Sequence, residues 1–210
     1  MENPVIIFGA KGLGAVALDI FESNDVVVYG FLEDDEKLHN QEIGSVAVMG
    51  NTDDERYLKL IGKKCEAFVA TDETQLRKSL VEMLHERRHI QPVNAVHPAT
   101  FVSPMAQMGH GNLLAAGAVL NTNARLGSHC VVHAKALIDY DAKVGDFVQI
   151  GAGSIVGSGA TVEDGVFIGA GVVIVAGVTV GKNARVGAGS VVVESVAAGS
   201  TVFGYPAKKV

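Results

Sequence analysis

The second half of the chain repeats every six residues, and this repeat restricts the fold more than any other feature. Fifteen units follow one another from Val102 to Val191, and each begins with Val, Ile, Leu or Met. The fifth position is Ala, Ser, Cys or Val in nearly every unit, with Asn112 as the polar exception. An aliphatic residue held in this phase predicts a parallel β-helix of short strands and turns. We expect three units to form one coil, with the first residue of each unit inside a narrow prism.

The other positions of the unit agree with this fold. Small residues at the fifth position fit near a corner, so Cys130 is interpreted as packing filler rather than as a reactive partner of His129. Glycine often occupies the second or fourth position, where a turn requires left-handed backbone angles. A flexible glycine-rich segment is the alternative interpretation, and the strict aliphatic phase excludes it.

The first 96 residues have a different pattern, which predicts a small α/β domain. "PVIIFGAKGLGAVALDIFES" starts with the apolar run Val5 to Phe8, continues through a glycine turn and then follows helical spacing. Two more apolar runs, "DVVVYGFLEDD" and "KKCEAFVATD", and the helical pattern "TQLRKSLVEMLHER" follow. Alternating strands and helices predict a parallel, Rossmann-like sheet. The expected domains are therefore residues 1–96 and residues 97–210.

The glycine turn has two interpretations. Gly9, Gly12 and Gly14 do not match the dinucleotide-binding fingerprint, so they could form only a tight turn between strand and helix. Alternatively, a helix N-terminus with bare backbone N–H groups receives a phosphate. A domain of this length is short for NAD binding, which favours a nucleotide sugar as the ligand.

Composition excludes several classes of protein. Residues 1–96 carry 10 basic and 17 acidic residues, a net charge of −7, and residues 97–210 carry 7 and 6, a net of +1. No basic patch stands out, so no nucleic-acid partner is expected. Two cysteines are too few for a disulfide framework. The uncharged stretch 165–181 is shorter than the roughly 20 residues of a membrane span. With no signal peptide recognisable, we expect a cytoplasmic protein without a membrane partner.

The repeat resembles that of the hexapeptide-repeat acyltransferases, whose fold is a left-handed parallel β-helix. A glycine-turn α/β domain, then "AVHPATFVSP", then hexapeptides and the ending "VFGYPAKKV" resemble the NeuD/PglD-type sugar O- and N-acetyltransferases. "GFLEDD" is similar to the acidic stretch of that family's second strand. The resemblance implies a nucleotide-sugar site in the first domain and acetyl-CoA bound by the β-helix. It also implies a homotrimer with active sites between adjacent prisms.

The resemblance also suggests binding residues. The nucleotide sugar would contact the glycine turn and the acidic stretch, namely Gly9, Lys11, Gly12, Leu13, Glu33 and Asp34. The groove for acetyl-CoA would be lined by Gly157, Ser158 and Ala188. Four basic residues near the C-terminus would contact the CoA phosphates, or they would form only a solvated basic end. These residues are Lys182, Arg185, Lys208 and Lys209.

Three positions depart from the family. Acyl transfer needs a base and donors for the oxyanion, and the family's base is a histidine beside a carboxylate. Here the corresponding stretch is Asp139-Tyr140-Asp141, a second family histidine is replaced by Gln149, and the histidine of the glycine turn by Leu13. The pKa of Tyr is about 10 and that of His about 6.5, and flanking carboxylates raise the pKa of a phenol. Tyr140 is therefore a poor substitute for the base.

His133 is the alternative base. It lies seven residues before Tyr140, so both side chains could border one cleft, with Asp139 or Asp141 orienting the imidazole. A surface histidine on a turn is the competing interpretation. His85 and His89 have the spacing of a helical metal pair but no third ligand, so no metal is predicted.

The sequence thus supports an acyltransferase, expected to use acetyl-CoA, that acts on an amino or hydroxyl group of a nucleotide-linked sugar for a surface glycan. The alternative is a trimeric paralogue that has lost catalysis and has a binding or structural role. The replaced histidines favour the second hypothesis, and the glycine and carboxylate framework favours the first. A relative of the β-helical carbonic anhydrases would need three histidine ligands and would leave the first domain unexplained.

Overall fold

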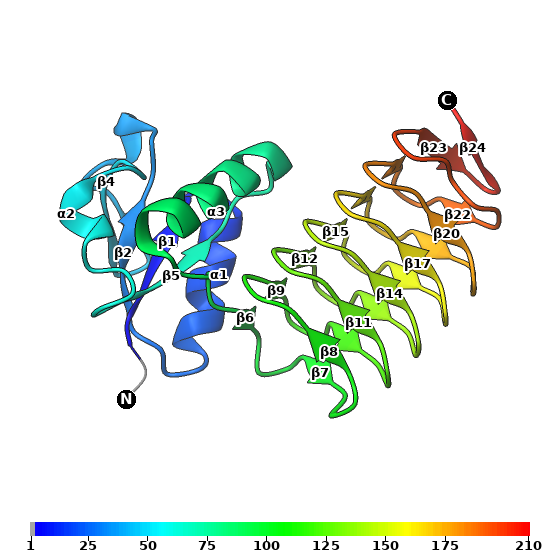
Figure 1. Ribbon diagram of the computed structural model, residues 1–210, viewed down its shortest axis with the longest axis horizontal. Helices are drawn as coiled ribbons and strands as arrows, with labels where there is room; N and C mark the ends of the chain where they lie inside the picture. Colours follow the sequence, from blue (N-terminus) through cyan, green and yellow to red (C-terminus); the bar gives the residue numbers. More distant parts are fainter. Residues whose placement is uncertain (1–2) are drawn as a thin grey trace. The chain divides into compact units, whose positions relative to one another are not determined.

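The computed structural model describes residues 3–210 and divides into two compact units (Figure 1). The first unit ends at Pro98 and the second runs from Ala99 to Val210. The boundary therefore lies two residues beyond the one expected from the sequence.

The first unit is a small Rossmann-like α/β domain, as predicted. Its sheet has the order β3-β4-β2-β1-β5, with parallel neighbours except for the antiparallel pair β3–β4. Its strands are β1 (Val5–Phe8), β2 (Val28–Leu32), β3 (Glu42–Ile43), β4 (Val46–Gly50) and β5 (Glu66–Val69). The two-residue strand β6 (Ala95–Val96) follows near the end of this unit and does not belong to this sheet. The helices are α1 (Leu13–Glu22), the short α2 (Glu55–Leu58) and α3 (Thr74–Arg88), with a 3₁₀ turn at Glu36–Leu38.

Close backbone packing explains the glycine turn between β1 and α1. A Cβ atom on Gly9 would collide with the carbonyl oxygen of Ala70, and one on Gly14 would collide with that of Gly9. Gly9 also has a φ of 104°, which side chains rarely adopt. Helix α1 begins directly after Gly12. The glycines thus let β1, α1 and the segment after β5 approach one another.

Both longer helices present an apolar stripe to the sheet. In α1 the buried side chains include Ala17, Leu18 and Phe21, and Phe21 meets Phe68 of β5 edge to face at 5.6 Å between ring centroids. In α3, Leu80, Val81 and Leu84 are buried. This spacing is the helical period read from the sequence.

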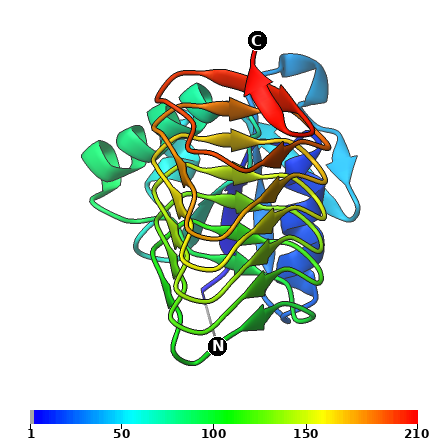
Figure 2. The same ribbon diagram turned by 90° about the vertical axis from the view of Figure 1, so that its right-hand side faces the viewer.

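The second unit is a β-helix with three faces (Figure 2). The first face consists of β7 (Phe101–Val102), β10 (Val119–Leu120), β13 (Leu137–Ile138), β16 (Ile155–Val156), β19 (Val173–Ile174) and β22 (Val191–Val192). The second face consists of β8 (Gln107–Met108), β11 (Arg125–Leu126), β14 (Lys143–Val144), β17 (Thr161–Val162) and β20 (Thr179–Val180). The third face contains β9 (Leu113–Leu114), β12 (Val131–Val132), β15 (Gln149–Ile150), β18 (Phe167–Ile168), β21 (Arg185–Val186), β23 (Thr201–Gly204) and β24 (Ala207–Lys209).

The strand register confirms three units per coil. Leu137 pairs with Val119 of the preceding coil and with Ile155 of the following one, all in parallel. First-position residues are buried in every unit from Leu114 to Val186, as the sequence predicted. The two earlier ones, Val102 and Met108, are partly exposed.

The fifth position is also buried in every unit from Asn112 to Ser190, and here the polar exception has an explanation. Asn112 has no exposed surface, and its amide donates to the carbonyl of Gly127 at 2.9 Å and accepts from the N–H of Cys130 at 2.8 Å. The amide therefore links its own coil to the next. Cys130 is itself fully buried, which confirms its role as packing filler.

Candidate functional site

Asp139, Tyr140 and Asp141 form a turn where the chain passes from the first face to the second, between β13 and β14. We call this place the Tyr140 corner. Oδ1 of Asp139 accepts two hydrogen bonds, from Nδ2 of Asn121 and from the N–H of Tyr140, each at 2.9 Å. Asp139 is thus held in place by the coil before it. The Tyr140 side chain is 51% exposed.

His133 lies at a different corner, where the chain passes from the third face to the first, between β12 and β13. We call this place the His133 corner. Its Nε2 atom is 3.2 Å from Nε2 of the buried Gln149, one of the three departures noted in the sequence. When the amide donates, the imidazole nitrogen accepts and the proton stays on Nδ1. Gln149 is therefore placed to select the tautomer of His133.

The separation of these two corners differs from the expectation that His133 and Tyr140 border one cleft of a single chain. His133 and Asp139 occupy the second position of successive units, and strand β13 lies between them. Six residues carry the chain from one corner to the next, so the short sequence separation does not bring the side chains together. In one chain His133 contacts Gln149, whereas Asp139 contacts Asn121.

The expected donor residues also divide between the two corners. Gly157 and Ser158 lie one coil beyond Asp139 and Tyr140, at the Tyr140 corner, whereas Ala188 follows β21 at the His133 corner. A Cβ on Gly157 would come within 2.6 Å of the Ile174 carbonyl oxygen. The glycine therefore keeps the backbone of successive coils in contact.

In the first unit, a hollow of about 340 Å³ opens beside the glycine turn. Gly9, Lys11, Gly12, Glu33 and Asp34 line it together with residues that the sequence did not single out, among them Thr52 and Asp72. Leu13 is the exception: its side chain is 4% exposed and belongs to the hydrophobic core. Five of the six expected substrate-binding residues thus lie around one hollow.

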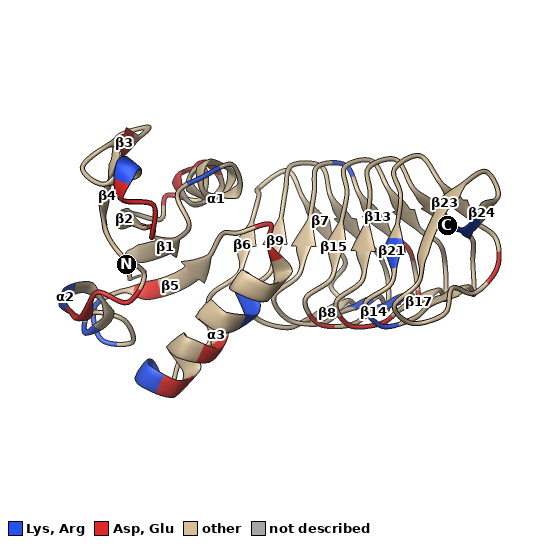
Figure 3. Cartoon of the chain, turned by 90° about the horizontal axis from the view of Figure 1, so that it is seen from above, with Lys and Arg blue, Asp and Glu red and all other residues tan. Residues whose placement is uncertain are grey.

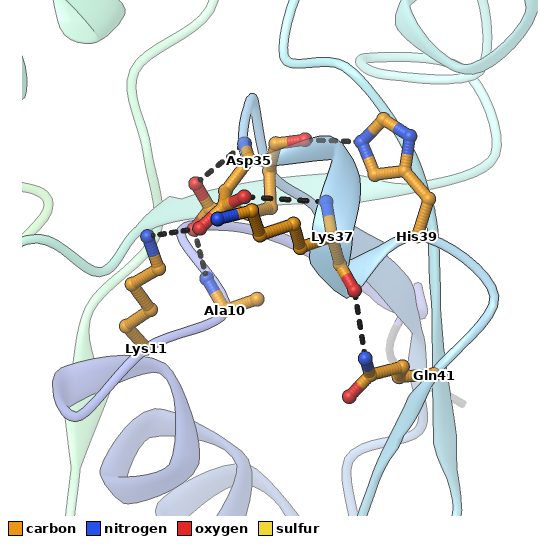
Figure 4. Close-up of polar contacts among 7 residues, drawn as sticks. Ala10, Lys11, Asp35, Lys37, His39 and Gln41 are labelled. Carbon is orange, nitrogen blue, oxygen red and sulfur yellow. Dashed lines mark hydrogen bonds and ion pairs between the residues drawn. The ribbon is translucent and has the colours of Figure 1, made fainter.

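Carboxylates in and beside this hollow accept hydrogen bonds from neighbouring segments, and Figure 4 shows those around Ala10 and Asp35. The Glu33 carboxylate accepts the N–H of Ala10 at 3.0 Å and that of Asp35 at 3.2 Å. Asp34 accepts both the N–H and the hydroxyl of Thr52, at 2.8 and 2.9 Å. The second strand and the glycine turn are thereby joined by side chains. Nothing in the sequence near Thr52 indicated this partnership.

Lys11 and Asp35 form an exposed ion pair at the rim, with Nζ 2.8 Å from Oδ2. The hydrogen bond to Asp35 raises the pKa of Lys11, and the same bond lowers the pKa of Asp35. Both groups are consequently charged at neutral pH. Asp35 also accepts the N–H of Lys37 at 3.2 Å, so its carboxylate is fixed from two sides.

The late basic residues do not form one cluster of free charges. Lys182 lies 3.5 Å from Asp164, and the guanidinium of Arg185 stacks 4.5 Å above the ring of Phe167. Lys208 and Lys209 belong to the terminal hairpin β23–β24. Two of the four cations thus already have partners.

Two further findings concern metal ions and membranes. Within residues 3–210, His, Cys, Asp and Glu side chains do not gather in groups of three or more that could hold a metal ion. Helix α3 ends at Arg88, and His89 caps it with left-handed backbone angles. His89 therefore does not lie on the helix that carries His85, although the sequence had suggested that it would. None of the helices described in the structure is long and apolar enough to cross a membrane.

Two family models match the chain. The PglD N-terminal domain matches residues 4–84, and the bacterial transferase hexapeptide model matches residues 159–193. No curated protein matches the chain. The matches correspond to the two units of the fold.

Several solved structures are similar over the full length. A variant of perosamine N-acetyltransferase from Caulobacter crescentus, in complex with CoA and GDP-perosamine, is 27% identical, with a TM-score of 0.91 over 100% of this chain and 98% of that chain. The acetyltransferase domain of PglB from Neisseria gonorrhoeae, in complex with acetyl coenzyme A, is 26% identical, with a TM-score of 0.90 and 100% of both chains covered. WeeI from Acinetobacter baumannii is 25% identical, with a TM-score of 0.85 and 99% of both chains covered.

The repeat, the fold and these matches place the chain in the hexapeptide-repeat acyltransferase superfamily. Within that superfamily, its two domains and their order are those of the NeuD/PglD-type sugar acetyltransferases.

Proposed function

We propose that this protein transfers an acetyl group from acetyl-CoA to an amino or hydroxyl group of a nucleotide-linked sugar. The observation that carries the proposal is the likeness, over the whole chain, to a perosamine N-acetyltransferase in complex with CoA and GDP-perosamine. The hollow beside Gly9 and Glu33 is the proposed nucleotide-sugar site. This full-length likeness does not favour a purely structural role. A cytoplasmic location fits both substrates.

We further propose a homotrimer, because the first face of the β-helix is apolar along its outer side. Its outward strand residues are exposed or half-buried and all hydrophobic: Phe101, Val119, Leu137, Ile155, Val173 and Val191. The corresponding residues of the second face are Gln107, Arg125, Lys143, Thr161 and Thr179. An apolar face beside a polar one supports burial of the first face against further copies of the chain.

The trimer would also resolve the separation of the two corners. The Tyr140 corner and the His133 corner are the two edges of the first face. In a ring of three prisms with the first face toward the axis, one edge of each prism lies beside the opposite edge of the next. His133 of one copy could then approach Asp139 and Tyr140 of its neighbour, and Ala188 could approach Gly157 and Ser158.

In the proposed reaction, the acceptor's amine or hydroxyl attacks the thioester carbonyl of acetyl-CoA. The Gln149 amide gives up its hydrogen bond to Nε2 of His133, and this nitrogen takes the proton from the attacking atom. The C–S bond breaks as the tetrahedral intermediate collapses, and the thiolate of CoA receives the proton from the imidazolium. The carboxylates of Asp139 and Asp141 would stabilise the imidazolium that forms. If the base is instead a group of the substrate or a water molecule, we propose these carboxylates as its partners.

The test is CoA release from acetyl-CoA with a panel of nucleotide-linked amino and hydroxy sugars. We expect turnover that falls at least about a hundredfold in His133→Ala, the usual contribution of a general base. His110→Ala, an exposed histidine on another turn of the β-helix, is the matched control and should retain activity. Unchanged turnover in His133→Ala would overturn the role of His133. Failure of acetyl-CoA to bind in calorimetry would overturn the proposed function itself.

A further inference from the structure

A groove of about 510 Å³ lies on the second face of the β-helix, beside the Tyr140 corner. Asn123 and Asp141 line it from the corner, and Gln107, Arg125 and Lys143 line it from strands β8, β11 and β14. Figure 3 shows charged residues along the side of the β-helix that carries β8, β14 and β17. This polar groove contains none of the residues that the sequence assigned to donor binding.

Two cations stand next to each other in this groove. Arg125 and Lys143 are direct partners in the register of β11 and β14, so their backbones are about 4.8 Å apart. Like charges opposite each other on neighbouring strands repel and destabilise the pair. Within residues 3–210, neither side chain forms an ion pair or a hydrogen bond. Asp141 is the one acid that lines the groove, which leaves an excess of positive charge.

This arrangement matches an anion with several acceptor oxygens. A guanidinium presents a planar fork of donors, and an ammonium is a compact point charge, and both bind phosphate. The side-chain amides of Gln107 and Asn123 also line the groove and add neutral donors. We propose that the Arg125–Lys143 groove binds a phosphate group of one of the two substrates.

The position of the groove limits which phosphate it takes. Asp141 lines the groove and directly follows Tyr140, so a bound phosphate lies near the proposed reaction centre. In a nucleotide sugar, only the sugar ring separates the diphosphate from the acceptor group. In acetyl-CoA, the whole pantetheine arm separates the phosphates from the thioester. The assignment of the phosphate to one of these two substrates rests on the proposed function, whereas the binding of a phosphate group by the groove does not.

A binding measurement tests the groove without requiring turnover. Inorganic pyrophosphate is titrated calorimetrically into wild type and into the double variant Arg125→Gln/Lys143→Gln. We expect at least about tenfold weaker binding in the variant, since charge-assisted hydrogen bonds are lost, and a smaller difference at higher salt. The control is Lys63→Gln/Lys64→Gln, which removes two exposed lysines of the first unit. Pyrophosphate that binds elsewhere on the protein contributes equally to wild type, to the groove variant and to the control variant. Equal binding by wild type and the groove variant would therefore overturn the proposal.

Steady-state kinetics then identify the source. An increase in the KM for the nucleotide sugar alone assigns its diphosphate to the groove, and an increase in the KM for acetyl-CoA alone assigns the CoA phosphates. Unchanged KM values for both substrates, in a variant whose thermal unfolding matches wild type, contradict the proposal. Absence of turnover in wild type would count against the proposed function, whereas the calorimetric comparison would still decide the groove.

Discussion

The buried amide of Asn112 provides a quantitative test of how successive coils are held together. Asn112→Ala removes the acceptor of the Cys130 N–H and one of two donors to the Gly127 carbonyl, which also accepts the N–H of Gly109 at 3.3 Å. The carbonyl therefore keeps a partner, but the buried N–H does not. An unsatisfied buried donor costs about 1–3 kcal/mol and a lost hydrogen bond about 1. We expect a loss of about 2–4 kcal/mol in the free energy of unfolding.

Urea unfolding followed by circular dichroism, at one fixed protein concentration, measures this loss. The concentration must be fixed because the stability of an oligomer depends on it. Gln107→Ala removes an exposed amide of the same β-helix and should change the free energy of unfolding by less than about 0.5 kcal/mol. If Asn112→Ala changed it no more than this control, the buried hydrogen bonds would not carry the stability assigned to them.

Three further predictions concern the apolar face, the rim of the nucleotide hollow and a buried thiol. Ile155→Asp places a charge on the apolar first face and should convert trimers to monomers in analytical ultracentrifugation, whereas Thr161→Asp on the second face should not. The pKa of Asp35 is lowered by its hydrogen bond to Lys11, so its stabilising contribution is present at neutral pH and is lost as the pH falls through that lowered value. Between pH 7 and pH 3, roughly, Asp35→Asn should therefore lose less stability than wild type in thermal unfolding, and equal losses would contradict the ion pair. Burial raises the pKa of the Cys65 thiol, so Cys65 should react with a thiol reagent only after denaturant is added, and fast labelling of the native protein would contradict its burial.

Much of the fold could be predicted because the chain repeats its own pattern. The aliphatic first position predicted the inward-facing residues of the β-helix. The apolar runs such as Val5–Phe8, which alternate with helical patterns, predicted the parallel sheet. The family resemblance grouped the acidic stretch Glu33–Asp34 with the glycine turn. The structure places both around one hollow, because the carboxyl ends of neighbouring parallel strands share one edge of a sheet. The partnership of Asp34 with Thr52 could not be predicted, because loop conformation alone brings these residues together.

The candidate catalytic residues show where sequence separation misleads. His133 and Tyr140 are close in the chain, yet strand β13 lies between them and they occupy successive corners. Leu13 stands in the glycine turn but points into the core, because the first turn of α1 packs against the sheet. Proximity in the sequence therefore did not show which of these residues share a site.

The sequence by itself determined the period, the side of each strand that faces inward and the order of the two units, because these depend on local alternation of apolar and small residues. Only the tertiary structure decided which side chains meet across coils. The contacts of Asn112 with Gly127 and of His133 with Gln149 join residues fifteen and sixteen positions apart. The unpaired charges of Arg125 and Lys143 likewise became visible only when stacking the coils placed them side by side, since a hydrogen bond or an ion pair is decided by distance in space.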